Sequence, residues 1–489
     1  MEEIYMETMV NREMLEFDVD TRLVDPGSRK TGIPFHLQKQ DVTLIVRWGD
    51  GTHSILKSSD YTTKNAEASV HEYPAPGRYH ISISIDSRHT WSDVYISTLD
   101  CPDIVFECVP SLFNEKTECM RYFKKTLEAI TSPLPNFKGT LQYTLSDPSM
   151  SCNGLRLDDN FAFLFIHCVS LKSVCPKLFS NIRHSISFSY AFYGCRSLEF
   201  IPDELFKGCI DVLSYSYCFY GCYSLTSIPS KLFKNSYKAQ GFKGVFKDCL
   251  NVKDIPEDLF NGNYHAELFS EAFQNCLSIT SIPENLFAKC HNATGFSSTF
   301  ENCIKIAEIP ENLFANCRRT LYFRSVFSKS GIKSIPSKLF AGLKNVTTYS
   351  YAFSWCSNLV EVPGDLFSDS LYVKDFSGCF YGCKDLQKIG RKIFSYAIYA
   401  RKFSHCFYGC KSLKNAVIEI ASRVVDTVYL FVQKSSDANI VIVTQIMSTT
   451  ARLLEAKSRE LGIKTTESFF FRGPFYAFLH SILRIVRRD

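Results

Sequence analysis

The phrase FYGCYSLTSIPSKLF, at residues 219–233, decides the fold because close variants of it recur through half of the chain. It returns as FQNCLSITSIPENLF at 273–287, as FENCIKIAEIPENLF at 300–314 and as FYGCKDLQKIGRKIF at 380–394. A repeat of fixed length predicts a solenoid, in which each unit buries its apolar face only by stacking on its neighbours.

One residue per unit, which we call the anchor, measures the period. Successive anchors lie 27 residues apart, except for one 26-residue step that follows Ser330, the single anchor that is not a cysteine. The anchors are Cys168, Cys195, Cys222, Cys249, Cys276, Cys303, Ser330, Cys356, Cys383 and Cys410. Ten units stacked about 4.8 Å apart, the spacing of hydrogen-bonded strands, would make a rod roughly 50 Å long.

Two short helical turns are expected in each unit. Phe269, Phe273 and Cys276 fall at positions i, i+4 and i+7, which predicts one face of a short helix. In the sequence IPENLF, Pro283 can begin a second helical turn because the first turn of a helix does not need its N–H. The phenylalanines are thereby interpreted as core residues rather than as a cofactor pocket.

Extended segments such as Ser278 to Ile282 join these turns, and we expect them to form narrow parallel ladders between units. The anchors then form a column of equivalent side chains, and free cysteine is typical of buried packing positions. We therefore predict buried thiols, although stacked coils would also be close enough for disulfide geometry. The chain has no CxxC pair and no Cys/His set at zinc spacing.

The unit resembles the BspA-like leucine-rich repeat, whose copies read F-x-x-C-x-x-L-x-x-I-x-x-P or a close variant. The resemblance extends over about residues 165–418 and rests on ten copies. It implies a leucine-rich-repeat solenoid of short parallel strands and short helical turns, with adhesion or recognition as its function rather than catalysis. The unit is longer than the one most common in that family, and no export signal is visible.

Residues 1–100 are predicted to form an N-terminal β-sandwich, because apolar residues alternate in two stretches. The alternating residues are Val42, Leu44, Val46 and Trp48, then Tyr79, Ile81, Ile83 and Ile85. The turn WGDGT at 48–52, followed by HEYPAPGRYHISISI at 71–85, resembles the PKD-type immunoglobulin-like module. Asp50 could be read as a metal or acid residue, but its place in a tight turn favours a turn-capping role.

The segment before the repeats is predicted to cap them. Residues 101–160 are interpreted as a connector and a degenerate N-terminal cap, and residues 115–129 within it are expected to be helical. A cap is needed because the first coil would otherwise expose an open apolar end. The solenoid itself is assigned to residues 161–418.

Residues 419–489 are predicted to form a small C-terminal α/β cap or docking segment. Strands are expected at 428–432 and 440–443, and a helix is expected to end at Leu461. An amphipathic helix follows at 475–486, with an apolar stripe opposite basic residues. It would either pack on the last coil or dock another subunit or a membrane surface.

Composition excludes several classes of function. The 489 residues carry a net charge of +5, too dilute to indicate a nucleic-acid partner, and the only basic cluster is the terminal group Arg484, Arg487 and Arg488. No run of 18 apolar residues occurs, so no transmembrane segment is expected. The N-terminus lacks the apolar core of a signal peptide, so we expect a cytosolic protein, or one that leaves by another route or has lost its signal; the starting Met disfavours the last.

No catalytic motif is present. The sequence has no phosphate-binding glycine loop, HExxH, GxSxG or paired carboxylates, and its 11 histidines are scattered. The neighbours His405 and Cys406 lack the third group that would make them a nucleophile and its base, and their spacing fits the repeat. We expect a protein that is not an enzyme and that binds no cofactor and no metal ion.

Tyrosines in two outward-pointing columns, two and five residues before the anchor, are the candidate binding residues, together with one tyrosine directly after an anchor. They are Tyr193, Tyr220, Tyr381 and Tyr408, then Tyr190, Tyr217 and Tyr351, and finally Tyr223. Tyrosine offers a large amphipathic contact surface at low entropic cost, and aromatic faces suit sugar rings. The alternative is that these rings only pack against loops or adjacent domains. In the central units the columns carry polar residues, so the tyrosines fall into two terminal patches.

Together these observations predict a non-enzymatic recognition or structural protein. We expect a bacteriophage virion appendage that binds a host-surface glycan or protein, because a surface-type architecture is combined with a start that lacks a signal. A bacterial cell-surface adhesin and a cytosolic scaffold are the alternatives. Expected partners are other subunits of an assembly, bound through the helix at 475–486, with oligomerisation left open and no nucleic acid. The expected location is a virion or the cell surface, after synthesis in the cytosol.

Overall fold

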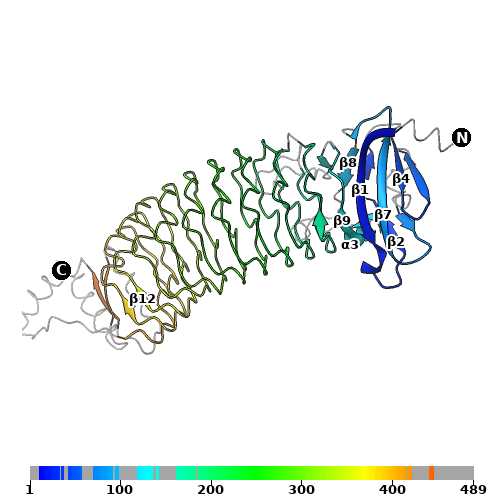
Figure 1. Cartoon of the computed structure of the whole chain (residues 1–489). Coiled ribbons are helices and arrows are strands. Elements are labelled where there is room, and N and C mark those ends of the chain that lie inside the picture. Colours follow the sequence, from blue (N-terminus) through cyan, green and yellow to red (C-terminus); the bar gives the residue numbers. More distant parts are fainter. Residues whose placement is uncertain are drawn as a thin grey trace, which may run out of the picture.

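The computed structural model has the form of a rod, with β-sheets at its N-terminal end and stacked coils running from there toward the C-terminal end (Figure 1). The predicted repeat solenoid is therefore confirmed. The residues that the structure describes are 10–33, 35–37, 42–57, 70–91, 94–97, 118–135, 139–141, 161–182, 185–414, 416–420 and 440–444.

A six-stranded sheet organises the N-terminal end, with the strand order β11-β9-β1-β7-β4-β5. Its longest strands, β1 (Val10–Asp20) and β7 (Arg78–Asp86), are antiparallel, and β4 (Thr43–Arg47) joins β7 to β5 (His53–Lys57). A three-stranded sheet has the order β10-β8-β3, and β2 pairs with β6. The bounds of these shorter elements are η1 (Thr21–Leu23), β2 (Lys30–Gly32), β3 (Phe35–Leu37), β6 (Val70–Glu72), β8 (Val94–Ser97) and β10 (Gly139–Leu141).

The alternation seen in the sequence fixes which face of this sheet is buried. Leu44 and Val46 of β4, with Ile81 and Ile83 of β7, are fully buried, and the tight turn at 49–51 joins β4 to β5. These contacts follow from the period of two in a strand, which sends every second side chain to the same face. The finer assignment of this module to the PKD-type immunoglobulin-like fold stays a prediction.

The N-terminal sheet continues directly into the solenoid. Strand β9 (Leu127–Ile130) pairs antiparallel with β1 and parallel with β11 (Ser173–Val174), which belongs to the first coil. The helix predicted at 115–129 is shorter than expected: α3 (Glu118–Thr126) ends where β9 begins. The reason is that Leu127 and Ile130 are buried in the sheet between β1 and the first coil.

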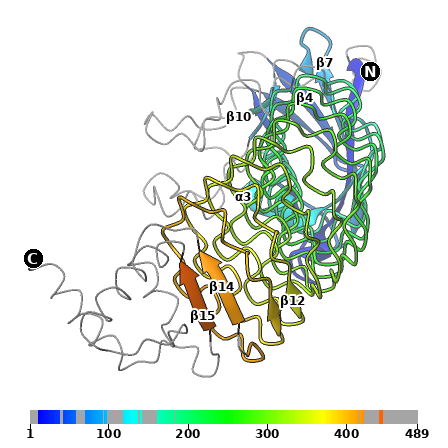
Figure 2. The ribbon, with the colours of Figure 1, turned by 90° about the vertical axis from the view of Figure 1, so that its left-hand side faces the viewer.

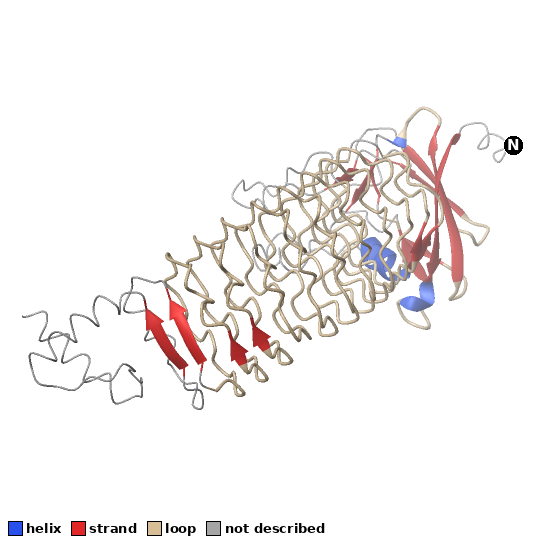
Figure 3. Ribbon diagram, turned by 60° about the vertical axis from the view of Figure 1, so that its left-hand side comes forward, coloured by secondary structure: helices blue, strands red, loops and turns tan. Residues whose placement is uncertain are grey.

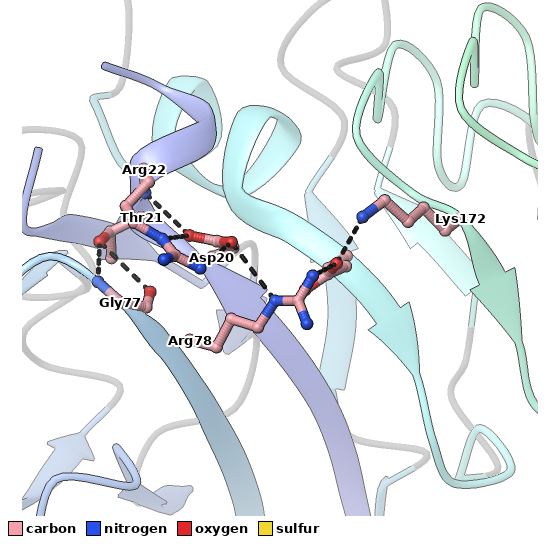
Figure 4. A network of polar contacts seen from close by, with 7 residues as sticks. Asp20, Thr21, Arg22, Gly77, Arg78 and Lys172 are labelled. Atoms are coloured by element: carbon pink, nitrogen blue, oxygen red, sulfur yellow. Dashed lines mark hydrogen bonds and ion pairs between the residues drawn. The ribbon is translucent and has the colours of Figure 1, made fainter. Parts of the chain in front are cut away.

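A chain of charged side chains lies along the same junction (Figure 4). Glu128 of β9 accepts hydrogen bonds at 2.7 Å from Arg78 of β7 and from Lys172 of the first coil. Arg78 also reaches Asp20, 3.4 Å away, and Asp20 pairs with Arg22 at 2.8 Å. Hydrogen bonds from Arg22 hold the pKa of Asp20 below its ordinary value, with burial opposing them. The network thus connects β1 and β7, through Glu128 of β9, to the first coil of the solenoid.

Each coil is held to the next by a segment that we call the turn ribbon, which runs from eight residues before the anchor to the anchor itself. In the ribbon at 268–276, the N–H of Phe269 donates to the carbonyl of Gly295 in the next coil at 3.0 Å. Alternate N–H groups along the ribbon make the same contact. The turn ribbons therefore form a parallel ladder in the direction of the rod.

The prediction of two helical turns in each unit is wrong. In the ribbon, Glu271 and Asn275 both have φ of 62°, in the left-handed region, and the N–H of Cys276 bonds to the carbonyl three residues back. An α-helix needs right-handed φ throughout and bonds that span four residues. The second turn also has a three-residue bond, from the N–H of Leu286 to the carbonyl of Pro283. Within the described coils both segments are turns, drawn as loops in Figure 3.

The parallel ladders expected at positions such as 278–282 are found chiefly in the outer coils. They comprise β11 in the first coil and the pair β12 (Glu361–Val362) and β13 (Lys388–Ile389) near the other end. In the central coils the same segment has single bonds, such as Thr280 N–H to the carbonyl of Lys253 at 3.3 Å. A second column of parallel bridges, which the sequence did not indicate, begins each turn ribbon and includes Leu268.

A continuous hydrophobic core extends through the rod from the N-terminal sheet to the last coil. A second, small cluster of Ala162, Phe163 and Ile166 packs against Tyr190 and Tyr193. Phenylalanines at equivalent positions stack between coils, as in the pair Phe273 and Phe300, whose ring centroids are 5.7 Å apart with planes at 4°. Beyond the last coil, β14 (Ala416–Ile420) pairs parallel with β15 (Ile440–Thr444), as Figure 2 shows from the C-terminal side. The predicted strand at 428–432 and the predicted helices after residue 444 lie outside the described residues.

Candidate binding face of the solenoid

The turn ribbon determines which residues reach the surface. Its two phenylalanines and its anchor are buried, so the residues five and two before the anchor lie on the outside. Five of the predicted tyrosines there are half-buried: Tyr190, Tyr193, Tyr217, Tyr220 and Tyr381. The other three predicted tyrosines are exposed: Tyr223, Tyr351 and Tyr408. The structure gathers them, apart from Tyr223, into two groups at opposite ends of the same face.

The first group, the N-terminal aromatic patch, consists of Phe163, Tyr190, Tyr193, Tyr217 and Tyr220. The rings of Phe163, Tyr190 and Tyr217 stack in one column, with centroids 4.9 and 5.1 Å apart. Tyr193 and Tyr220 stack in a second column at 4.5 Å, with planes at 10°. Successive coils thus place equivalent rings face to face.

Two lysines end these columns at the next coil. The ammonium groups of Lys243 and Lys247 each lie 5.6 Å from a ring centroid, over Tyr217 and Tyr220 respectively, within the range of a cation–π contact. Both lysines also pair with Glu271, at 3.6 and 2.7 Å. Beyond the aromatic columns, the face therefore becomes a network of charged side chains.

A glycine in the next coil provides the space for the outer ring of a column. Tyr217 lies over Gly244, which has φ of 56°, and a Cβ added to this glycine would collide with Cε1 and Cδ1 of the ring. Tyr351 lies over Gly378 in the same way. Both glycines occupy the position five before the anchor, where the backbone is left-handed. Glycine at this position adopts the left-handed φ without strain and also leaves room for the tyrosine ring.

The second group, the C-terminal aromatic patch, consists of Tyr351, Trp355, Tyr381, His405 and Tyr408. Tyr381 and Tyr408 stack at 5.2 Å with planes at 14°, and Trp355 meets Tyr381 edge to face at 5.2 Å. Trp355 is 50% exposed, more than any tyrosine of the patch. His405 packs edge to face against Tyr408 at 5.6 Å.

Tyr223 belongs to neither patch. It follows its anchor directly, and the guanidinium of Arg196 lies 5.5 Å from its ring centroid. The equivalent positions in the next three coils are the apolar residues Leu250, Leu277 and Ile304. Tyr223 therefore begins an apolar row beside the turn ribbons rather than joining an aromatic column.

The stacked rings present edges and hydroxyl groups rather than open faces. Because Tyr190 lies between Phe163 and Tyr217, both of its faces are covered by other rings. Burial, with help from the charge of Glu271, raises the pKa of Tyr217 far above its ordinary value, so its phenol stays neutral. The flat contact with a sugar ring that the sequence suggested is thus unavailable at Tyr190, while its outer edge remains at the surface.

Sequence reasoning missed three members of the patches: Phe163, Trp355 and His405. Each occupies a left-handed position of the turn ribbon, five or one residue before the anchor, with φ of 57 to 62°. The search for tyrosine alone excluded them. The column five residues before the anchor already contains Phe163 and His405, whereas Trp355 lies in a third column, one residue before the anchor.

Two other predicted features have structural explanations. Asp50 accepts a hydrogen bond at 2.9 Å from the N–H of Thr52 and lies 2.9 Å from Nε2 of His71, so it caps the turn. Burial opposes its ionisation, but the bonds from Thr52 and His71 lower its pKa to about 2. Next to the exposed His405, the thiol of Cys406 is buried, and burial raises its pKa well above the ordinary value.

Within the described ranges, no three His, Cys, Asp or Glu side chains lie close enough together to hold a metal ion. Of the helices that the structure describes, none is both long and apolar enough to cross a bilayer.

The repeats identify the family. A model described as a BspA type leucine rich repeat region matches the chain in six copies, over residues 161–282, 273–370 and 346–448. These matches cover more than half of the 489 residues, so the chain belongs to this family. The resemblance inferred from the repeated phrase is thereby confirmed, and such repeats are associated with protein–protein or surface binding.

No curated protein matches the chain. Among solved structures, one titled "Crystal structure of TLR13-ssRNA13 complex" is similar at 10% sequence identity, with a TM-score of 0.14. The match covers 57% of this chain and 58% of that chain, so this chain spans less than two thirds of its length. A likeness of this size supports no conclusion about the ligand.

Proposed function

We propose that this protein is a non-enzymatic recognition protein, which binds a partner protein or glycan through the turn-ribbon face of its solenoid. The observation that supports this function is the pair of aromatic patches at the two ends of that face. Each patch is built from rings that neighbouring coils hold in place, and it offers exposed edges and hydroxyl groups at the surface.

The rigidity of the rings favours binding. A tyrosine that stacks on its neighbour has already lost its rotamer freedom, so a partner does not have to order it again. Phenol hydroxyls donate to carbonyl or sugar oxygens, and the ring edge supplies apolar contact. Peptides and glycans both offer such oxygen acceptors and apolar surface, so the proposal includes both classes of partner.

The test compares two patch variants with a matched control in a binding assay on intact cells and on a glycan array. The variants are Tyr193→Ser with Tyr220→Ser, and Tyr381→Ser with Tyr408→Ser. The control, Tyr237→Ser with Tyr264→Ser, removes two tyrosines that are 51% and 49% exposed but lie outside both patches. We expect at least one patch variant to bind about tenfold more weakly than the control. Equal binding by all three would refute the proposal.

We further propose that the protein is displayed on a surface, and that the surface is a bacteriophage virion, with a bacterial cell surface as the alternative. The BspA-type repeats support surface display in general. Mass spectrometry of purified particles, membranes and cytosol separates the locations. Absence of the chain from particles would exclude the virion, and its confinement to the cytosol would favour an internal scaffold.

Two finer structural assignments are also proposals. The WGDGT turn, capped by Asp50, supports a PKD-type module at the N-terminal end. Residues 419–489 would act as a C-terminal cap or docking segment, with the amphipathic stretch at 475–486 as the contact to other subunits. Deletion of 475–486 tests this role: loss of a larger assembly in light scattering, with the melting temperature unchanged, would support docking.

A further inference from the structure

The last coils of the solenoid carry a concentration of positive charge. Residues 371–414 contain nine lysines and arginines but only two acidic residues, Asp375 and Asp385, whereas the whole chain has a net charge of +5. All nine basic side chains are exposed. They are Lys374, Lys384, Lys388, Arg391, Lys392, Arg401, Lys402, Lys411 and Lys414. Within the part of the chain that the structure describes, only Arg391 pairs with a carboxylate, that of Glu419 at 2.6 Å.

Five of these cations border the C-terminal aromatic patch on two sides. At the start of the turn ribbons, the N–H groups of Arg401 and Lys402 donate to the carbonyl of Lys374 in the coil before, at 3.0 and 3.1 Å. At the other end of the ribbons, Lys384 and Lys411 directly follow their anchors in adjacent coils, and the carbonyl of Lys384 accepts from Ser412 at 3.0 Å. The stacked rings of the patch therefore lie between two rows of cations.

The two aromatic patches differ in the charge of the residues that precede their turn ribbons. The residues directly before the ribbons of the N-terminal aromatic patch, equivalent to Lys374 and Arg401, are Ile186 and Leu213, which are apolar and exposed. Adjacent coils are separated by about 4.8 Å, which is shorter than the Debye length of about 8 Å at physiological ionic strength. Neighbouring cations at the C-terminal end therefore act together on an approaching anion.

We infer that the C-terminal aromatic patch binds a linear anionic polysaccharide, whose carboxylate or sulfate groups pair with the two rows of cations. Hydroxyl groups of the same chain meet the edges and phenol groups of Tyr381 and Tyr408. This inference rests on the proposed function and adds the chemical class of the partner at one of its two patches. The N-terminal aromatic patch, whose ribbons follow apolar residues, would take a different surface.

The arrangement favours a glycan over a nucleic acid. Single-stranded nucleic acids bind by stacking bases on open aromatic faces, but Tyr381 and Tyr408 cover each other. Reading a duplex usually requires a helix or a β-ribbon in a groove, and the described residues of these coils form turns and two-residue strands. Lysines outnumber arginines by seven to two, which suits point contacts with carboxylates or sulfates rather than bidentate contacts with phosphates or bases.

The test measures binding of the full chain to immobilised heparin, polygalacturonate and neutral dextran by biolayer interferometry in 0.15 M salt. The patch variant replaces Lys374, Lys384, Arg401, Lys402 and Lys411 with Gln. The control variant removes the same charge elsewhere by replacing the exposed residues Lys231, Lys234, Lys253, Lys289 and Lys305 with Gln. We expect the wild type to bind one or both charged glycans but not dextran. The patch variant should lose about tenfold or more in affinity and the control less than about twofold.

Three results would overturn the inference. Equal losses in both variants would show that binding follows net charge and not the patch. Tighter binding to a 20-residue oligothymidine than to either charged glycan would assign the patch to nucleic acid. If the wild type binds neither charged glycan while Tyr381→Ser with Tyr408→Ser still weakens cell binding, the anionic partner is wrong and the proposed function stands. Circular dichroism and melting curves establish that both charge variants are folded.

Discussion

The thiol of Cys276 lies 3.1 Å from the carbonyl oxygen of Phe246 in the preceding coil, and this contact recurs at most anchors. The others are Cys195, Cys222, Cys249, Cys303, Cys356, Cys383 and Cys410. The anchor thus packs as a small apolar residue and also donates a weak hydrogen bond. Ser330 also has a donor, but its hydroxyl group donates to the carbonyl oxygen of Phe327 in its own coil, at 2.6 Å. Burial was predictable from the repeat, whereas the donor role was not, because the sequence does not show the facing carbonyl.

The buried thiols should be unreactive in the native protein. Burial is defined for sixteen cysteines: fifteen are buried, and Cys175 is half-buried. Burial raises the pKa of Cys303 to about 12, so very little thiolate forms near pH 8. With Ellman's reagent, at most Cys175 and the four remaining cysteines, Cys101, Cys108, Cys119 and Cys152, should react before unfolding. All 20 should react in denaturant. A lower count in denaturant would reveal disulfides.

At the scale of the turn ribbon, the sequence predicted which side chains are inside but not the backbone that puts them there. Positions i, i+4 and i+7 are buried in a helix and equally in this series of three-residue turns, so periodicity alone could not separate them. The clue was the residue before the anchor, which is often Gly or Asn, as at Gly221 and Asn275. These residue types tolerate left-handed φ, and both positions have it.

Gly244→Ala tests the fit between ribbon and ring. The new Cβ would strain a left-handed residue and displace Tyr217, so we expect a loss of about 2 kcal/mol or more in the free energy of unfolding. Gly342→Ala is the matched control: its φ is 76°, but no atom lies within 4 Å of the added Cβ. It should cost about 1 kcal/mol. Urea denaturation followed by fluorescence measures both, and equal losses would mean that the ring contact contributes nothing.

The binding face was predictable in part for a related reason. The outward columns follow from the period, so the positions of Tyr193 and Tyr381 could be read from the sequence. The sequence does not show that the rings cover one another's faces, because stacking depends on the side-chain torsions and on the distance between coils. The cationic border was also missed, because its residues are spread over 38 positions of the sequence, from Lys374 to Lys411, and only the coil brings them together.

At the scale of the whole molecule, the N-terminal sheets and the solenoid are one body. The six-stranded sheet runs through β9 into the first coil, and the core is continuous from Leu15 to Ile420. The sheet thus crosses the boundaries predicted at residues 100 and 160. The connector was difficult to interpret from sequence because its role depends on β1 and β11, which lie far from it along the chain. The N-terminal module closes the apolar end that a repeat would otherwise expose.

Glu128→Ala should loosen this junction. The carboxylate of Glu128 is 11% exposed and pairs with Arg78 and Lys172, so its loss should cost about 1 kcal/mol. Hydrogen exchange should rise in β9 and in the first coil together. The control, Glu204→Ala, removes a carboxylate that is 58% exposed and pairs only with Lys207 within one coil. It should change neither exchange nor stability. Faster exchange in β9 alone would contradict the conclusion that the N-terminal sheets and the solenoid form one structural unit.

The ladder of N–H groups along the turn ribbons also has a mechanical consequence. Because these bonds point along the rod, a force applied between its ends would load one interface between coils at a time, and the chain would unzip from the weakest end. Each coil that peels away releases 27 residues, roughly 90 Å of extended chain. A tethered molecule under tension would therefore lengthen in nearly equal steps and absorb sudden pulls.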